Sequence, residues 1–148
     1  MPREIAVDTS VIVASLLTWH EHHEAARRSL AEALHDARLV IPAPALVESY
    51  AVMTRLPAPH RLRARDAYAL LADNFAASAR VESLTGGEIW SMLATLASGS
   101  IGGGRTYDAQ ILAAALKSRA VALLTLDLED FTALARDQIE IRSPLGRR

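Results

Sequence analysis

Residues 5–17 read Ile-Ala-Val-Asp-Thr-Ser-Val-Ile-Val-Ala-Ser-Leu-Leu, which is a short apolar run, three residues with oxygen-bearing side chains, and a second apolar run. Short side chains of this kind are favoured at the residue that precedes a helix. Asp8, Thr9 and Ser10 therefore predict a strand over 5–7 that passes directly into a helix over 11–17. A strand followed at once by a helix is the opening unit of an α/β fold.

The rest of the chain continues this alternation. Short apolar runs predict strands at 39–41, around Val81, at 121–124 and at 139–141; helical spacing and capping predict helices over 22–37, from Pro44 to the turn at 57–59, and over 61–75, 85–98, 106–119 and 127–135. The chain contains no internal repeat and no linker. The pattern therefore predicts an α/β fold, with a mostly parallel sheet between helices, in a single domain over residues 1–148.

The predicted helix 85–98 has the clearest pattern in the chain. Thr85 and Glu88 form a capping-box signature, and apolar residues follow at helical spacing. We expect Trp90 to be a packing residue. At the next predicted helix, Thr106 is the expected cap.

Composition limits the classes of protein that the chain can be. Hydrophobic residues make up 51% of its 148 residues and charged residues 22%, which excludes long disorder. No run approaches the roughly 20 apolar residues that cross a bilayer, so we expect no membrane span. The chain has no cysteine, which fits a reducing cytoplasm and excludes thiolate metal sites. Its net charge of −1 means that nucleic-acid binding must be argued from a site rather than from bulk charge.

Acidic residues occur where such a fold places its ligand crevice, beyond the carboxyl ends of the strands. Asp8 ends the first strand, and Asp127 follows the strand at 121–124. Asp108 lies in the first turn of the helix that leads into that strand, and this helix starts at the same rim of the sheet. Glu48 lies one turn into a helix that is otherwise apolar. We expect the four acids to share one rim.

Each of these acids also has a purely structural interpretation. Asp8 and Asp127 are good helix caps, Asp108 suits the positive end of a helix dipole, and Glu48 could pair with Arg55. Four carboxylates in one partly dehydrated cleft would repel one another, however, unless a cation neutralises them. Oxygen ligands without cysteine select a hard ion such as Mg²⁺ or Mn²⁺, which indicates metal-assisted hydrolysis of a phosphoester.

The motifs that carry these acids resemble those of a known family. The resemblance rests on four segments, which are Val7-Asp8-Thr9-Ser10, the helical Glu48, Arg105-Thr106-Tyr107-Asp108-Ala109, and Leu124-Thr125-Leu126-Asp127-Leu128-Glu129-Asp130-Phe131. In this order and at this spacing, over essentially the whole chain, they resemble the PIN-domain ribonucleases, in particular the VapC toxins of bacterial toxin–antitoxin pairs.

The resemblance implies specific roles for residues of this chain. It places the family's metal-binding acids at Asp8, Glu48, Asp108 and Asp127. It places the small hydroxyl residues that orient ligands and waters at Thr9, Ser10 and Thr125. Asp130, three residues after Asp127, could also support the site, but we interpret it as a helix cap.

The resemblance also implies a fold, an activity and partners. The fold would be the three-layer PIN-like α/β fold, with a parallel five-stranded sheet between helices. The activity would be that of an endoribonuclease that depends on Mg²⁺ or Mn²⁺ and acts as the toxin of a type II toxin–antitoxin system in the cytoplasm. The partners would be an RNA substrate, a second copy in a homodimer, and a cognate antitoxin whose helix lies over apolar surface of the N-terminal helices.

Two other functions are compatible with the acids. A receiver-like or phosphatase-like domain would hold Mg²⁺ around a phosphorylated aspartate, but no second acid stands two residues after Asp8 and no Lys follows a late strand. A catalytically inactive PIN-like scaffold would bind RNA without cutting it, which four intact acids disfavour.

Overall fold

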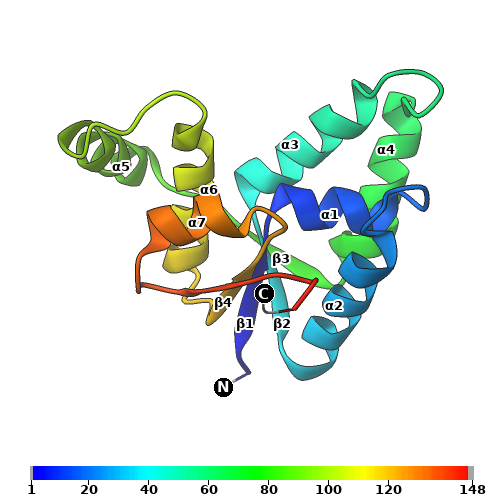
Figure 1. Cartoon of the computed structure of the whole chain (residues 1–148), viewed down its shortest axis with the longest axis horizontal. Coiled ribbons are helices and arrows are strands. Elements are labelled where there is room, and N and C mark those ends of the chain that lie inside the picture. The colour runs from blue at the N-terminus through cyan, green and yellow to red at the C-terminus, as the bar shows by residue number, and fades with distance from the viewer. Residues whose placement is uncertain (1, 147–148) are drawn as a thin grey trace.

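The chain folds as an α/β protein, described in a computed structural model over residues 2–146 (Figure 1). The strands are β1 Glu4–Val7, β2 Arg38–Pro42, β3 Ala79–Glu82, β4 Ala122–Leu124 and β5 Glu140–Arg142. The helices are α1 Thr9–Leu16, α2 His23–Asp36, α3 Ala43–Thr54, α4 Ala64–Leu71, the π-helix η1 Ala72–Ala76, α5 Gly86–Ser98, α6 Arg105–Lys117 and α7 Leu128–Ala135. The predicted alternation of strands and helices is confirmed.

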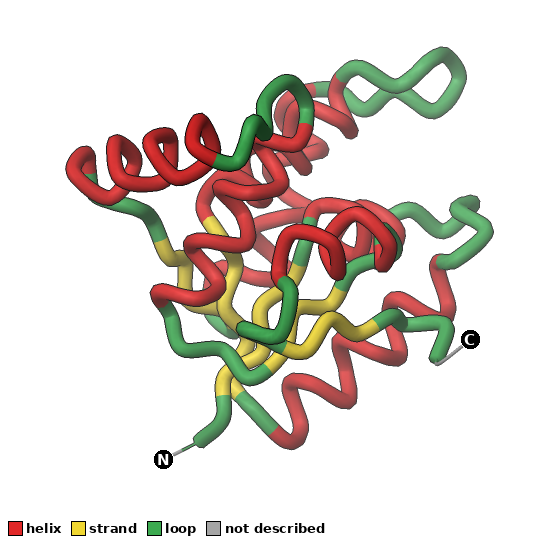
Figure 2. Tube along the Cα trace, turned by 60° about the vertical axis from the view of Figure 1, so that its left-hand side comes forward, coloured by secondary structure: helices red, strands yellow, loops and turns green. Residues whose placement is uncertain are grey.

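All five strands belong to one parallel sheet in the order β3-β2-β1-β4-β5. The chain moves from β1 outward to β3, then returns across the sheet to β4 on the other side of β1. Helices α1 to α4 accordingly lie on one side of the sheet and α5 to α7 on the other (Figures 1 and 2). The point where the direction reverses lies between β1 and β4, and ligands of open α/β sheets bind at such a point.

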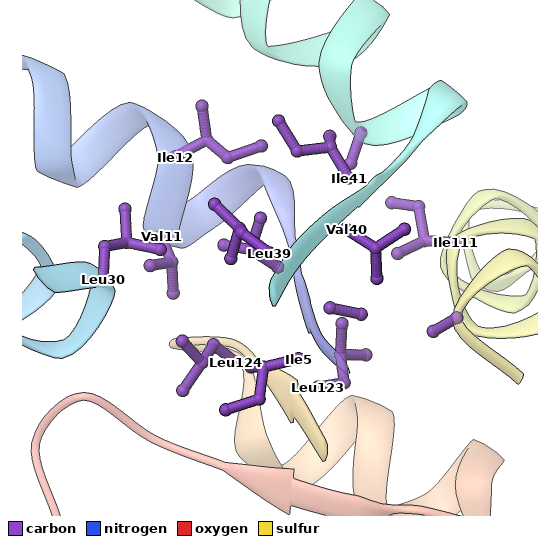
Figure 3. Packing of buried hydrophobic residues seen from close by; sticks show 14 of the residues in the cluster. Ile5, Val11, Ile12, Leu30, Leu39, Val40, Ile41, Ile111, Leu123 and Leu124 are labelled. Atoms are coloured by element: carbon purple, nitrogen blue, oxygen red, sulfur yellow. The ribbon is translucent and has the colours of Figure 1, made fainter. Parts of the chain in front are cut away.

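Alternate residues of the central strands build the core on both faces of the sheet. On β2, Leu39 and Ile41 point toward α1, whereas Val40 points toward Ile111 of α6 (Figure 3). All four side chains are buried, as is Phe131 of α7. The three layers therefore share an apolar interior that fixes where each strand ends.

Two predicted helix starts are wrong by a few residues. The helix predicted from residue 61 begins at Ala64, because the segment before it folds back on α3: Leu62 N donates to Met53 O at 3.0 Å. The helix expected to be capped by Thr106 begins at Arg105, with Gly104 in the cap position. Both differences come from local backbone geometry that apolar spacing does not report.

The helix α5 is formed and capped as predicted, but its packing is not as predicted. Thr85 Oγ1 accepts from Glu88 N at 3.2 Å and Glu88 Oε1 accepts from Thr85 N at 2.8 Å, which completes the capping box. Within α5, however, only Leu96 is buried, and Trp90 is 75% exposed. The expected packing role of Trp90 is therefore wrong: α5 packs mainly against α6, and Trp90 lies on its exposed side.

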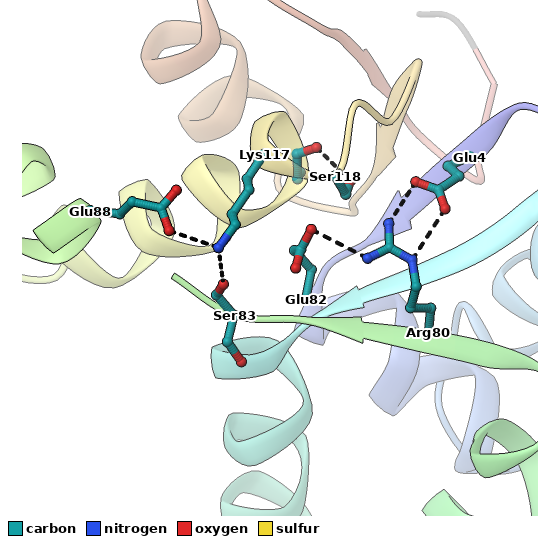
Figure 4. Close-up of polar contacts among 8 residues, drawn as sticks. Glu4, Arg80, Glu82, Ser83, Glu88, Lys117 and Ser118 are labelled. Atoms are coloured by element: carbon teal, nitrogen blue, oxygen red, sulfur yellow. Dashed lines mark hydrogen bonds and ion pairs between the residues drawn. The ribbon is translucent and has the colours of Figure 1, made fainter. Parts of the chain in front are cut away.

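Charged side chains secure the edges of this arrangement (Figure 4). Lys117 at the end of α6 donates to Glu88 Oε1 at 2.7 Å and to Ser83 O at 2.8 Å, which ties α6 to the start of α5. Arg80 on the edge strand β3 bonds Glu4 of β1 and Glu82. No helix described between residues 2 and 146 has both the length and the apolar character needed to cross a membrane.

The bond from Lys117 generates a prediction about α5. In Lys117→Met, the first turn of α5 loses its tie to α6, so its backbone amides should exchange with deuterium several-fold faster, while those of β1 and β4 keep their rates. Hydrogen-exchange mass spectrometry measures both regions in one experiment. Lys117→Arg, which keeps the charge, is the control, and equal exchange in all three proteins would contradict this role of Lys117.

Candidate functional site

The site lies where β1 and β4 end side by side. Val7 pairs with Leu124, so the next residues of the two strands emerge at the same edge of the sheet. Asp8 N donates to Leu124 O at 2.9 Å, which keeps the two strand ends in register. Asp8 follows β1 directly, and Asp127 follows β4 and immediately precedes α7. The sequence-based prediction that these two acids share one rim agrees with the structure.

Asp8 is held in place by two hydroxyl groups. Asp8 is 3% exposed, and its Oδ2 accepts hydrogen bonds from Ser10 Oγ and Thr125 Oγ1, both at 2.8 Å. The same hydroxyls accept backbone bonds from the β4 side: Leu126 N donates to Ser10 Oγ at 3.0 Å, and Asp127 N donates to Thr125 Oγ1 at 2.9 Å. The two hydroxyls thus connect the ends of both strands. We call Asp8, Ser10 and Thr125 the hydroxyl network.

Thr9, the third predicted hydroxyl, lies on a different side. Its Oγ1 faces Ala45 O of α3 at 3.5 Å, so it bears on the packing of α1 against α3. In this structure its hydroxyl does not contact Asp8, although its backbone bonds the Asp8 carboxylate. Thr9 therefore differs from Ser10 and Thr125 in what its side chain touches.

The helix-cap interpretation of the strand-end acids is not supported. Asp8 precedes α1 and Asp127 precedes α7, but neither side chain makes a capping hydrogen bond. The Asp8 carboxylate accepts from the two hydroxyls of Ser10 and Thr125 instead. A residue in a cap position whose side chain does not cap the helix is free to serve another role.

Glu48 and Asp108 reach the same space from helices α3 and α6, which pack against each other. Burial raises the pKa of Glu48, and so do the charges of Asp8 and Asp127, outweighing the opposite effect of Arg55. Burial also raises the pKa of Asp108, to about 6, with further contributions from Asp8, Asp127, Asp130 and Glu48. The four predicted acids are therefore brought together closely enough to repel one another.

The pKa values of the two strand-end acids, Asp8 and Asp127, are also raised. Burial is the largest cause of the raised pKa of Asp8; Asp127 adds to it, and the bonds from Ser10 and Thr125 oppose it. Burial and the charge of Asp130 raise the pKa of Asp127. The charge of Asp130 thus contributes to the raised pKa of both Asp108 and Asp127, which favours the supporting role that the sequence left open beside the helix cap. Its spacing of three residues from Asp127, one helical turn, was the signal available in the sequence.

The spacing of these acids bears on the metal that they could hold. Over residues 2–146, no three His, Cys, Asp or Glu side chains lie close enough to enclose a metal ion by themselves. Mg²⁺ does not require such a cage, because it binds through one or two carboxylates and keeps several waters. An oxygen-only set of separated, mutually repelling carboxylates fits a hydrated ion of this kind.

Comparison with known proteins gives one family and a consistent fold. The family described as PIN domain matches residues 5–137. Ribonuclease VapC40 of Mycobacterium tuberculosis is 39% identical over 137 residues, which cover 93% of this chain and 96% of that protein.

Solved structures of similar fold come from toxins and from toxin–antitoxin complexes. The crystal structure of Mycobacterium tuberculosis VapC20, described as a sarcin–ricin loop cleaving toxin, has a TM-score of 0.70 at 22% identity, covering 87% of this chain and 94% of that one. The structure of VapBC2 from Rickettsia felis, bound to a DNA fragment from its promoter, has a TM-score of 0.68 at 13% identity, covering 95% and 98%. These likenesses support the three-layer arrangement of helices around the sheet.

The repulsion at Asp108 predicts an unusual response to substitution. Its raised pKa means that the metal-free native state binds a proton more tightly than the unfolded chain, so stability increases as the pH falls through about 6 toward the ordinary value of 3.8. Above about pH 6 the ionised cluster destabilises the fold. Asp108→Asn should therefore raise the Tm of the metal-free protein by roughly 2–4 °C near pH 7.5, and by progressively less toward pH 4.

Thermal melts of both proteins in a chelator measure this difference. Taking the difference cancels the titration of groups outside the cluster, including His20, whose burial lowers its pKa and acts in the opposite direction. If Asp108→Asn lowers the Tm at all pH values, Asp108 is a stabilising residue of the first helical turn and the repelling cluster is refuted.

Proposed function

This chain belongs to the PIN-domain family, and from that premise we propose that it is an endoribonuclease toxin whose acids Asp8, Glu48, Asp108 and Asp127 hold Mg²⁺ or Mn²⁺ at the scissile phosphate of an RNA. The ribonuclease activity follows from the 39% sequence identity between this chain and a VapC ribonuclease over most of both chains. The roles of the individual acids and the metal rest on the site. The observation that carries them is a buried Asp8, fixed by two hydroxyls, in electrostatic contact with three further carboxylates.

The chain's own residues supply the positioning in this proposal. Ser10 and Thr125 hold Oδ2 of Asp8 on both sides, so the orientation of the carboxylate is set before any ligand binds. Glu48 and Asp108 approach from helices α3 and α6. Their pKa values are raised first by burial and then by the charges of the neighbouring acids, which a cation would neutralise. A bound divalent ion supplies an activated water and stabilises the charge that develops on the phosphate.

The alternatives are less well supported. The match of residues 5–137 to the PIN domain argues against a receiver-like or phosphatase-like domain. A PIN-like scaffold that binds RNA without cutting it would not need four acids at one rim, where burial and the charges of its neighbours raise the pKa of Asp108 to about 6.

Neutralising the acids should abolish catalysis without unfolding the protein. We expect Asp8→Asn, Asp108→Asn and Asp127→Asn each to lower RNA cleavage by a factor of 100 or more, an order of magnitude typical of a lost charged catalytic group. Mg²⁺ or Mn²⁺ should support cleavage and Ca²⁺ should support it poorly, because its longer and looser coordination misplaces the water. Gel assays of a labelled RNA, with circular dichroism as the folding control, measure both effects.

Stability provides a measure of metal binding that is independent of cleavage. Mg²⁺ at about 100 times its dissociation constant should stabilise the wild type by roughly 2.7 kcal/mol, and Asp108→Asn by much less. Full cleavage in excess chelator, or near-wild-type cleavage by any two of the three variants, would refute the four-acid site.

A protein partner is the second part of the proposed function. Solved structures of similar fold include toxin–antitoxin complexes, and we propose that an antitoxin restrains this chain as well. A cavity of about 370 Å³ lies between α3, α4, η1 and β3, and apolar side chains line it. Val47 at its rim is 69% exposed and Tyr68 is 68% exposed, which suits an apolar segment of an antitoxin. Because the cavity lies beside α3, an antitoxin segment bound there would lie near Glu48, which α3 carries.

Expression in bacteria tests the toxin role and this surface together. The wild type without antitoxin should arrest growth, and Asp8→Asn should relieve the arrest. Tyr68→Glu places a charge at the apolar cavity, so it should still arrest growth when the cognate antitoxin is co-expressed. Arg65→Glu, on the exposed surface of the same helix, is the control that the antitoxin should still neutralise. A wild type that cuts RNA in vitro but leaves growth unchanged would contradict the toxin role.

We also propose that the chain forms a homodimer and acts in the cytoplasm. An RNA substrate and a chain without cysteine both fit the cytoplasm. The molar mass of the isolated protein by light scattering measures the oligomeric state.

A further inference from the structure

A second cavity lies directly beside the acid cluster. It has a volume of about 730 Å³ and opens between the first turn of α7 and the segment that follows β5. We call it the α7 pocket. Asp127 and Asp130 line it and also belong to the acid cluster, so the pocket adjoins the acids. A ligand whose reacting part lies at the acids would place its neighbouring part in the α7 pocket.

The walls of the pocket are fixed to the same strands that carry the acids. Thr125 N donates to Arg142 O at 3.0 Å, which aligns the end of β5 with the end of β4. Beyond β5, Leu145 N donates to Ser143 Oγ at 3.1 Å and Gly146 N donates to Ser143 O at 3.2 Å, so the chain makes a turn at this place. Leu145 thereby forms one wall, and Leu126 and Leu128 form another.

The chemistry of the lining is both apolar and acidic. Leucine side chains offer flat apolar contact, and Glu129, which also belongs to the lining, carries a carboxylate with two acceptor oxygens. A phosphate group would be repelled by Glu129, Asp127 and Asp130 together. A nucleobase fits instead, because its faces are apolar and its edge carries N–H donors. The volume also lies in the range of about 300–1,000 Å³ that is usual for small-ligand sites.

We propose that the α7 pocket binds the nucleobase next to the scissile phosphate, and that Glu129 selects guanine there. This inference rests on the proposed ribonuclease function. The Watson–Crick edge of guanine presents two adjacent N–H donors, which match the two oxygens of one carboxylate. Adenine and cytosine present a donor beside an acceptor, and uracil presents a single donor between two carbonyls. A carboxylate therefore pairs with both of its oxygens only with guanine.

Sequencing the fragments cut from a randomised RNA oligonucleotide pool tests this selection. The wild type should favour guanine about tenfold or more at one position adjacent to the cut, the size expected for a bidentate contact to a base. Glu129→Gln replaces one acceptor with a donor, and a glutamine amide pairs with both of its groups to adenine. The variant should therefore shift its preference from guanine to adenine at that same position and leave the other positions unchanged.

Two further variants separate base selection from general effects. Glu21→Gln makes the same change of charge in the loop between α1 and α2, where Glu21 is 82% exposed, and should keep the guanine preference. Leu145→Ala removes an apolar wall, so it should raise the KM for all sequences alike without changing the preference. Identical base preferences in the wild type and Glu129→Gln, or no preference in the wild type, would overturn the inference.

Binding without cleavage keeps the two proposals distinguishable. Guanosine monophosphate, added to Asp108→Asn, should shift the methyl resonances of Leu126 and Leu145 more than uridine monophosphate does. If the wild type cuts no RNA, the proposed function fails, but this measurement still tests whether the α7 pocket prefers guanine. Equal shifts with both nucleotides would overturn the inference. If Glu129→Gln weakens antitoxin binding but leaves both nucleotide responses unchanged, the pocket receives an antitoxin side chain and the inference is wrong.

Discussion

The hydroxyl of Thr125 is the contact on which the site depends. It donates to the carboxylate of Asp8 and accepts from the backbone of Asp127, so one buried side chain fixes the two acids that end neighbouring strands. The sheet order makes this possible, because β1 and β4 are adjacent although more than one hundred residues separate them in the chain. A burial that would be costly for a lone carboxylate is offset here by two hydroxyl donors. The remaining acids need only reach this anchored pair.

Two of the remaining acids, Glu48 and Asp108, lie on helices. The position of each acid at a strand end or on a helix determines how well it could be predicted from the sequence. In a parallel sheet every strand end and every helix start lies at one rim, so Asp8, Asp108 and Asp127 follow from element order alone. Glu48 was detectable as an acid on an otherwise apolar turn. For Asp130 the sequence favoured a helix cap over a supporting role at the site, because capping and catalysis favour the same residue type in a first turn. Only the three-dimensional arrangement brings its charge onto Asp108.

The parts that the sequence did not predict depend on contacts across the layers. Apolar spacing identifies α5 as a helix but does not say how much of it other elements cover, and in this chain α5 packs mainly against α6 and only its Leu96 is buried. The start of α4 depends on a backbone bond from Leu62 to Met53, which no periodicity encodes. The α7 pocket is of the same kind, since the turn after β5 forms its wall and nothing in residues 143–146 resembles a binding motif.

The shared use of Asp127 suggests why the pocket and the acids are built on one scaffold. A nuclease must position the phosphate against its acids to within a fraction of an ångström, and a base held in a rigid neighbouring pocket limits the freedom of that phosphate. Both walls of the pocket are attached to β4 and β5, which are themselves linked through Thr125 and Arg142. A substitution of Glu129 can therefore change which base the pocket prefers without moving the hydroxyl network. Conversely, loss of the Thr125 hydroxyl would disturb Asp8 and Asp127 together, so it would impair cleavage of every sequence equally.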